Sequence, residues 1–144
     1  MDRPLSLPDG IDEIVDNFSL LDDWEDRYGY LIELGNALTP VPEEQMVDAN
    51  KVQGCVSQVW LISEYDDGKL HFKGASDAHI VRGLVAVALS IFSNKTPAQI
   101  AELDEQETFI AIGLAEHLTP QRSNGLKSLV GKIKATANAV LANA

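Results

Sequence analysis

The residue with the strongest nucleophilic capacity in this sequence is Cys55, its single cysteine. A thiolate is a strong nucleophile, although a free thiol with a pKa near ~8.5 is mostly protonated at neutral pH. One cysteine excludes an internal disulfide and any all-cysteine metal or cluster site. Gly54 and a polar segment precede Cys55, and a strand pattern follows it. Two interpretations stand side by side: a buried cysteine acting as a small hydrophobe, and a thiol presented on a loop.

Other catalytic arrangements are poorly supported by the residue pattern. The three histidines, His71, His79 and His117, are scattered, and no pair has ligand spacing, so the sequence indicates no metal site. The sequence shows no Ser-His-Asp constellation, glycine-rich motif or second cysteine. A freestanding reductase or hydrolase is therefore not expected.

Charge is unevenly distributed along the chain. The formal net charge is −11, and residues 1–48 carry 13 Asp and Glu side chains against two arginines. The stretch from Thr119 onward contains four basic residues and no acid. An acidic chain repels phosphate backbones, so nucleic-acid binding is not expected. The acidic end is interpreted as a solvated face, with a contribution to protein docking as the alternative.

Length and hydropathy indicate one domain over residues 1–144, with residues 1–10 as a loose N-terminal segment. A chain of 144 residues that is 45% hydrophobic can bury a sizeable core. Its longest apolar stretch, residues 84–92, is far short of the ~20 residues that span a bilayer, so no membrane association is expected. The N-terminus has neither the basic nor the apolar region of an export signal. We therefore expect a cytoplasmic protein.

The elements that must position Cys55 follow the order helices, small sheet, helices. Helical periodicity occurs over residues 11–18, 20–34, 80–92, 109–112 and 126–140, and strand patterns over residues 50–52, 56–62 and 70–73. Asp66-Asp67-Gly68 predicts a tight hairpin turn between two strands. Residues 80–92 are apolar nearly all round, which predicts a buried central helix. The class is α+β: a small antiparallel sheet of about three strands, packed by helices from both ends of the chain.

Polar residues of capping type precede most of the helical segments. They are Asp9, Ser19, Asp77, Thr96 and Thr119. A carboxylate or hydroxyl at such a position can accept a hydrogen bond from a free N–H of the first helical turn. We therefore expect a helix to begin after each of them.

Four blocks of the sequence resemble the SufE-type cysteine desulfuration family. The most specific surrounds the cysteine and reads Asn50-x-Val52-x-Gly54-Cys55-x-Ser57-Gln58-Val59-Trp60-Leu61. The other three lie at residues 24–35, 76–84 and 117–126, in order and at the expected spacing. The resemblance implies the α+β fold shared with IscU-type cluster scaffolds, although a single cysteine cannot hold a cluster as they do.

The resemblance implies a function in sulfur transfer. Cys55 would accept persulfide sulfur from a cysteine desulfurase of the SufS or CsdA type, activate that enzyme, and pass the sulfur to an iron–sulfur scaffold complex. The protein would be a sulfurtransferase-like accessory protein and not an independent enzyme. It would bind no cofactor, because the pyridoxal phosphate (PLP) belongs to the desulfurase. The alternative is a non-catalytic module that regulates a desulfurase or scaffold without carrying sulfur. Both a monomer and a homodimer are compatible with the sequence.

The resemblance also assigns residues to the cysteine loop and to partner docking. Gly54, Ser57 and Gln58 belong to the cysteine signature. Asp77 falls beside the cysteine loop, and its second interpretation is a helix cap. Arg122 falls near the cysteine and the desulfurase contact, and its second interpretation is a surface ion pair with an N-terminal acid.

Two further expectations concern partner choice and protection of the sulfur. Ala75 stands where the family often has an acid, and Met46 where many members have arginine, so both positions bear on partner specificity. We expect Cys55 to rest partly buried, with the carboxylate of Asp77 accepting hydrogen bonds from the backbone of residues 52–55.

Overall fold

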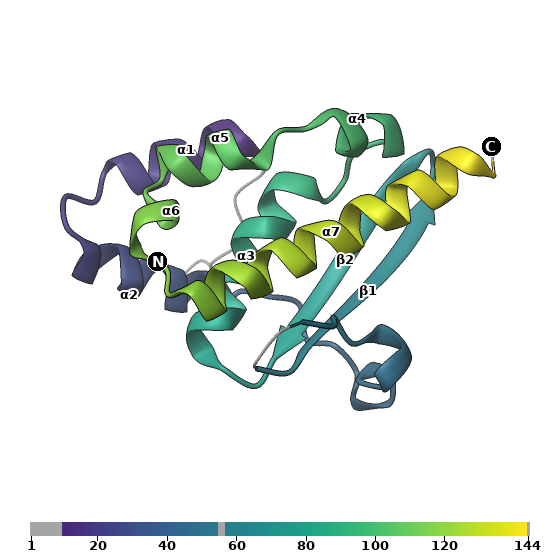
Figure 1. The fold of residues 1–144 in the computed structure, drawn as a ribbon, viewed down its shortest axis with the longest axis horizontal. Coiled ribbons are helices and arrows are strands. Elements are labelled where there is room, and N and C mark those ends of the chain that lie inside the picture. The colour runs from purple at the N-terminus through teal and green to yellow at the C-terminus, as the bar shows by residue number, and fades with distance from the viewer. Residues whose placement is uncertain (1–9, 55–56, 144) are drawn as a thin grey trace, which may run out of the picture.

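The computed structural model describes residues 10–54 and 57–143 (Figure 1). Its helices and strands confirm the α+β class. In chain order they are α1 (Ile11–Ser19), α2 (Trp24–Asn36), the 3-10 turns η1 (Glu43–Gln45) and η2 (Asp48–Asn50), β1 (Val59–Asp66), β2 (Lys69–Ser76), α3 (His79–Phe92), α4 (Pro97–Glu102), α5 (Glu105–Ala111), α6 (Leu114–His117) and α7 (Pro120–Ala142). The segment expected to be loose lies outside the described residues except for Gly10, as does Asp9, the expected first cap.

The sheet is one antiparallel hairpin. β1 and β2 pair in continuous register from Val59 opposite Ser76 to Asp66 opposite Lys69. The two turn residues have positive φ, 53° at Asp67 and 76° at Gly68. Positive φ at both central positions matches the twist of the flanking strands, so the predicted tight turn is confirmed.

In the described residues the sheet has two strands, where about three were expected. Lys51 forms only an isolated antiparallel bridge with Trp60. The Val52 N–H also donates to the Val59 carbonyl at 2.8 Å. The 3-10 turn η2 ends immediately before Lys51, and Gly54 has φ +88°. Because the chain bends on both sides of Lys51 and Val52, these residues form an isolated bridge and not a strand.

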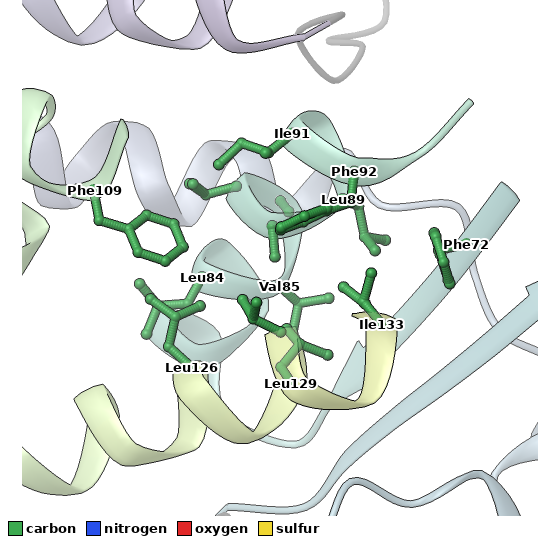
Figure 2. Packing of buried hydrophobic residues seen from close by; sticks show 14 of the residues in the cluster. Phe72, Leu84, Val85, Leu89, Ile91, Phe92, Phe109, Leu126, Leu129 and Ile133 are labelled. Atoms are coloured by element: carbon green, nitrogen blue, oxygen red, sulfur yellow. The ribbon is translucent and has the colours of Figure 1, made fainter. Parts of the chain in front are cut away.

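Helix α3 is the buried centre of the fold, as its composition predicts. Every residue from Gly83 to Phe92 is buried. It packs against α2, β2 and α7, and Figure 2 shows Leu84 and Val85 close to Leu126 and Leu129 of α7. Full burial of each such side chain contributes roughly 1.5–3 kcal/mol. The core therefore fixes α7 against the helix that begins beside the sheet.

Glycine brings α2 and α3 into close contact. A Cβ added to Gly83 would lie 2.4 Å from the Leu31 carbonyl oxygen. A Cβ added to Gly35 would lie 2.9 Å from the Cβ of Arg82. Side chains at these two positions would push the helices apart, which accounts for a glycine near the start of α3 and another near the end of α2.

Capping follows the prediction at the C-terminal helices and departs from it at two others. Thr96 is the expected cap and forms a capping box with Gln99, and the Thr119 hydroxyl accepts from the Arg122 N–H. Ser19 is not the cap of α2, because it is the last residue of α1 and its hydroxyl donates to the Asp16 carbonyl at 2.7 Å. Asp23 caps α2 instead, accepting from the Asp26 N–H. The cap expected at Asp77 is also wrong, because α3 begins after Ala78 with no side-chain cap. Helix α6 was not predicted.

Part of the acidic charge stabilises helix starts. The first turn of α1 contains Asp12 and Glu13, and that of α2 contains Glu25 and Asp26. Carboxylates at these positions interact favourably with the positive end of the helix dipole. No helix in the described part of the chain is long and apolar enough to cross a membrane.

Candidate functional site

A pocket of about 280 Å³ opens between the start of β1, the first turns of α3 and the N-terminal half of α7. Its buried lining residues are apolar: Val59, Leu84, Val85, Leu126 and Leu129. Its polar lining residues are partly or fully exposed: Ser57, Thr119, Gln121 and Arg122. The arrangement is an apolar interior with a polar, cationic rim, which is typical of a small ligand or side-chain site.

The residues on either side of the cysteine lie against α7 and this pocket. Ser57 lines the pocket directly. A Cβ added to Gly54 would lie 2.7 Å from the Ser128 Oγ. Because Gly54 also has φ +88°, this position requires glycine for both its conformation and its contact. Cys55 itself lies outside the described residues.

Asp77 is bound to the segment that follows the cysteine. Its Oδ1 accepts a hydrogen bond from the Gln58 N–H at 3.1 Å, and its own N–H donates to the Gln58 carbonyl at 3.3 Å. The register explains this pairing, because Val59 opposite Ser76 places Gln58 opposite Asp77. Asp77 therefore binds the backbone at Gln58, whereas the expectation concerned the backbone of residues 52–55.

Arg122 is partly exposed and lines the pocket. Its backbone N–H donates to the Thr119 hydroxyl at 3.3 Å, which fixes the first turn of α7. Within residues 10–54 and 57–143, the one ion pair joins Lys134 to Glu105. The interpretation of Arg122 as the partner of an N-terminal acid is therefore not supported by the described contacts. A cation at this rim can attract a thiolate, a persulfide anion or a partner carboxylate.

Two contacts that the sequence interpretation missed join α7 to the beginning of the cysteine loop (residues 51–58). The Lys132 Nζ donates a hydrogen bond to the Lys51 carbonyl at 3.2 Å, and burial lowers the pKa of Lys132. Ser128 is the neighbour of Gly54. The sequence already shows that α7 contains basic residues and no acid. The four-residue spacing of Ser128 and Lys132 was the signal that both side chains lie on the same face of this helix.

The two positions that depart from the family pattern lie on different elements. Ala75 is in β2 opposite Trp60, and both residues are partly buried. Met46 is partly buried at the end of η1. The Asn50 side chain donates to the Gln45 carbonyl at 2.8 Å, which connects η1 to the base of the cysteine loop.

Comparison with known proteins decides the family. The family model described as SufE, an Fe-S metabolism associated domain, matches residues 12–137. This chain belongs to the SufE family. It is 52% identical over 131 residues to an uncharacterized SufE-like protein of Rhizobium meliloti (strain 1021), covering 88% of this chain and 94% of that protein. A second uncharacterized SufE-like protein, from Rhizobium etli, is also 52% identical over 131 residues, covering 88% of both chains.

A solved structure has the same fold as this chain. The solution structure of a hypothetical protein from Thermus thermophilus superposes with a TM-score of 0.76 at 20% sequence identity. The match covers 94% of this chain and 98% of that one. At this identity the likeness establishes the fold alone.

Proposed function

We propose that this SufE protein accepts sulfur on Cys55 from the persulfide of a cysteine desulfurase and carries it toward iron–sulfur cluster assembly. The observation that carries the proposal is the pocket beside the cysteine signature, where Ser57 and Arg122 line one cavity. The family description supplies the link to iron–sulfur metabolism. The PLP that generates the donor persulfide belongs to the desulfurase.

The transfer is an exchange between sulfur atoms. The Cys55 thiolate attacks the outer sulfur of the donor persulfide and forms a new S–S bond. The S–S bond of the donor breaks, and the desulfurase cysteine leaves as a thiolate that takes up the proton given up by Cys55. The sum of oxidation states is unchanged, so the step needs no added oxidant or reductant.

The residues around the pocket suit the demands of this exchange. A thiol attacks only as its thiolate, and a nearby cation lowers the thiol pKa. The Arg122 guanidinium would supply that cation, or would bind a carboxylate of the desulfurase during docking. The apolar lining of Leu84, Leu126 and Leu129 would exclude water and oxidants from a persulfide held there.

The loop contacts suit a carrier that must guard its sulfur and then release it. Asp77 holds the segment after the cysteine through Gln58, and both residues are exposed. A docking partner can therefore reach this hydrogen bond and compete for it. A difference of ~1.4 kcal/mol between two loop positions changes their ratio tenfold, so one such contact is enough to bias the loop.

A non-catalytic module of the same fold is the second candidate, and the Cys55→Ser variant separates the two. Serine is nearly isosteric with cysteine, so the variant should fold, but it cannot accept sulfur. Alanine production by a purified desulfurase is measured with wild-type protein and with Cys55→Ser. Loss of stimulation by the variant, with an unchanged circular dichroism spectrum, supports the sulfur acceptor. Equal stimulation by both proteins would establish the regulatory module instead.

A further inference from the structure

Two residues of the segment before Cys55, Lys51 and Gly54, contact α7 in antiparallel order. Lys51, at the start of the loop, accepts a hydrogen bond from Lys132 at 3.2 Å. Gly54, three residues later, lies against Ser128, one helical turn earlier in α7. A turn of four residues rises about 6 Å, which three loop residues can span. The two contacts can therefore be made together by one face of the helix.

The hydrogen bond from Lys132 to Lys51 lies next to the backbone bond that joins the two ends of the cysteine loop. The Val52 N–H donates to the Val59 carbonyl at 2.8 Å, which joins the two ends of the loop. The Lys132 ammonium binds the carbonyl immediately before this closure. Burial lowers the pKa of Lys132, so its ammonium has given up part of its hydration for this position. The bond thus connects the closed base of the loop to a helix that the core holds in place.

We propose that Lys132 and Ser128 are positioning residues that hold residues 51–54 against α7, and that they thereby determine where the chain enters Cys55, the residue that accepts sulfur. The proposal rests on the proposed function for the identity of the transferred group. Lys132 fixes the base of the loop, and Ser128 provides the surface on which Gly54 lies. Neither residue contacts the donor in this account, so each acts through the loop.

The first arm of the test is hydrogen–deuterium exchange of the full chain without a partner. Lys132→Met removes the donor and retains most of the length of the side chain, and Ser128→Leu places a larger side chain where Gly54 lies. We expect amide exchange in the peptide containing Val52 to become about fivefold faster in both variants, or ~1 kcal/mol of lost protection. Lys132→Arg, which can still donate to the carbonyl, should remain within about twofold of wild type.

Lys127→Met is the matched control for the loss of charge. Lys127 is exposed on the same helix, five residues before Lys132, and therefore faces another direction. In Lys127→Met, amide exchange in the peptide containing Val52 should equal that of wild type. If the folded variants at positions 128 and 132 leave exchange at Val52 unchanged, or accelerate it uniformly along the chain, the positioning role is wrong.

The second arm measures sulfur acceptance from a saturating amount of desulfurase. We expect Lys132→Met to lower the rate of persulfide formation on Cys55 about fivefold, with recovery in Lys132→Arg, because small misplacements of a reacting group are costly. An unchanged rate despite faster exchange would overturn the positioning role. If wild-type protein takes up no sulfur at all, the proposed function fails, and the exchange arm still decides whether α7 holds the loop.

Discussion

The hydrogen bond from the Gln58 N–H to the Asp77 carboxylate, 3.1 Å long, joins the segment after Cys55 to the residue that connects β2 with α3. The Asp77 N–H returns a second bond to the Gln58 carbonyl at 3.3 Å. Gln58 and Asp77 thus form one further pair beyond the end of the sheet, held by one bond to the Asp77 side chain and one between backbone groups. These two bonds connect the segment after Cys55 to the residues that precede the central helix.

Loss of the Asp77 carboxylate should free the loop. A charged acceptor is worth more than a neutral one, but Asp77 is exposed, so we expect an effect of about 1 kcal/mol. Asp77→Arg should increase the alkylation rate of Cys55 by iodoacetamide about fivefold, and Asp77→Asn, which keeps an oxygen acceptor, should increase it less. Glu64→Arg, at an exposed position of β1, is the control. Equal alkylation rates in wild type and Asp77→Arg, with the fold intact, would show that Cys55 is guarded by other contacts.

Removal of the Arg122 guanidinium should affect the partner reaction and not the fold. Arg122→Ala leaves the backbone bond to Thr119 in place, so the thermal midpoint should stay within about 2 °C of wild type. Stimulation of the desulfurase should fall severalfold, and Arg122→Lys should recover only part of it, because lysine lacks the planar fork of donors. A loss of stability that parallels the loss of stimulation would assign Arg122 a structural role.

Gly54 and Ser128 should show energetic coupling. Gly54→Ala combines strain at φ +88° with a Cβ 2.7 Å from the Ser128 Oγ, and should lower the free energy of unfolding by about 1–2 kcal/mol. Ser128→Ala removes the oxygen and leaves the Ser128 Cβ at an ordinary 3.6 Å. The double variant should therefore regain part of the loss in denaturant unfolding. Strict additivity of the two single changes would contradict the contact.

Two glycines of the α2–α3 pair should respond in opposite directions to the same substitution. Gly83→Ala places a Cβ 2.4 Å from a backbone oxygen that cannot move aside, and should destabilise the protein by about 1–3 kcal/mol. Gly29 lies in α2 with nothing within 4 Å of an added Cβ, so Gly29→Ala should stabilise it by roughly 0.5–1 kcal/mol. Thermal unfolding of both variants measures the two changes in stability. A stability of Gly83→Ala equal to that of wild type would refute the close contact between the helices.

The sequence was most informative where local chemistry decides the structure. The apolar composition of residues 80–92, the capping box at Thr96 and the hairpin turn at Gly68 each specify one outcome through neighbouring residues alone. The third strand is absent from the described residues because only Val52 of residues 50–52 is of a type that favours strands, and because η2 and Gly54 bend the chain on either side of Lys51 and Val52. Bends of this kind depend on tertiary contacts that the local pattern does not contain.

The site was predicted as a set of residues and not as an arrangement. Ser57 and Arg122, far apart in the chain, were both singled out, and they line one pocket. Asp77 was expected to bind the loop or cap a helix, and only the strand register shows that it binds Gln58. Lys132 was missed, because a lysine in a helical pattern is normally interpreted as solvent-exposed. Only the fold shows that the Lys51 carbonyl lies within hydrogen-bond distance of it.

Sulfur acceptance by Cys55 can be observed by intact-protein mass spectrometry after incubation with a purified cysteine desulfurase and free cysteine. Wild-type protein should gain the mass of one sulfur atom, a reductant should remove it, and peptide mapping should place it on Cys55. Cys55→Ser, treated in the same way, should gain nothing. An unmodified wild-type protein in a reaction where the desulfurase is active would contradict the claim that this chain carries sulfur.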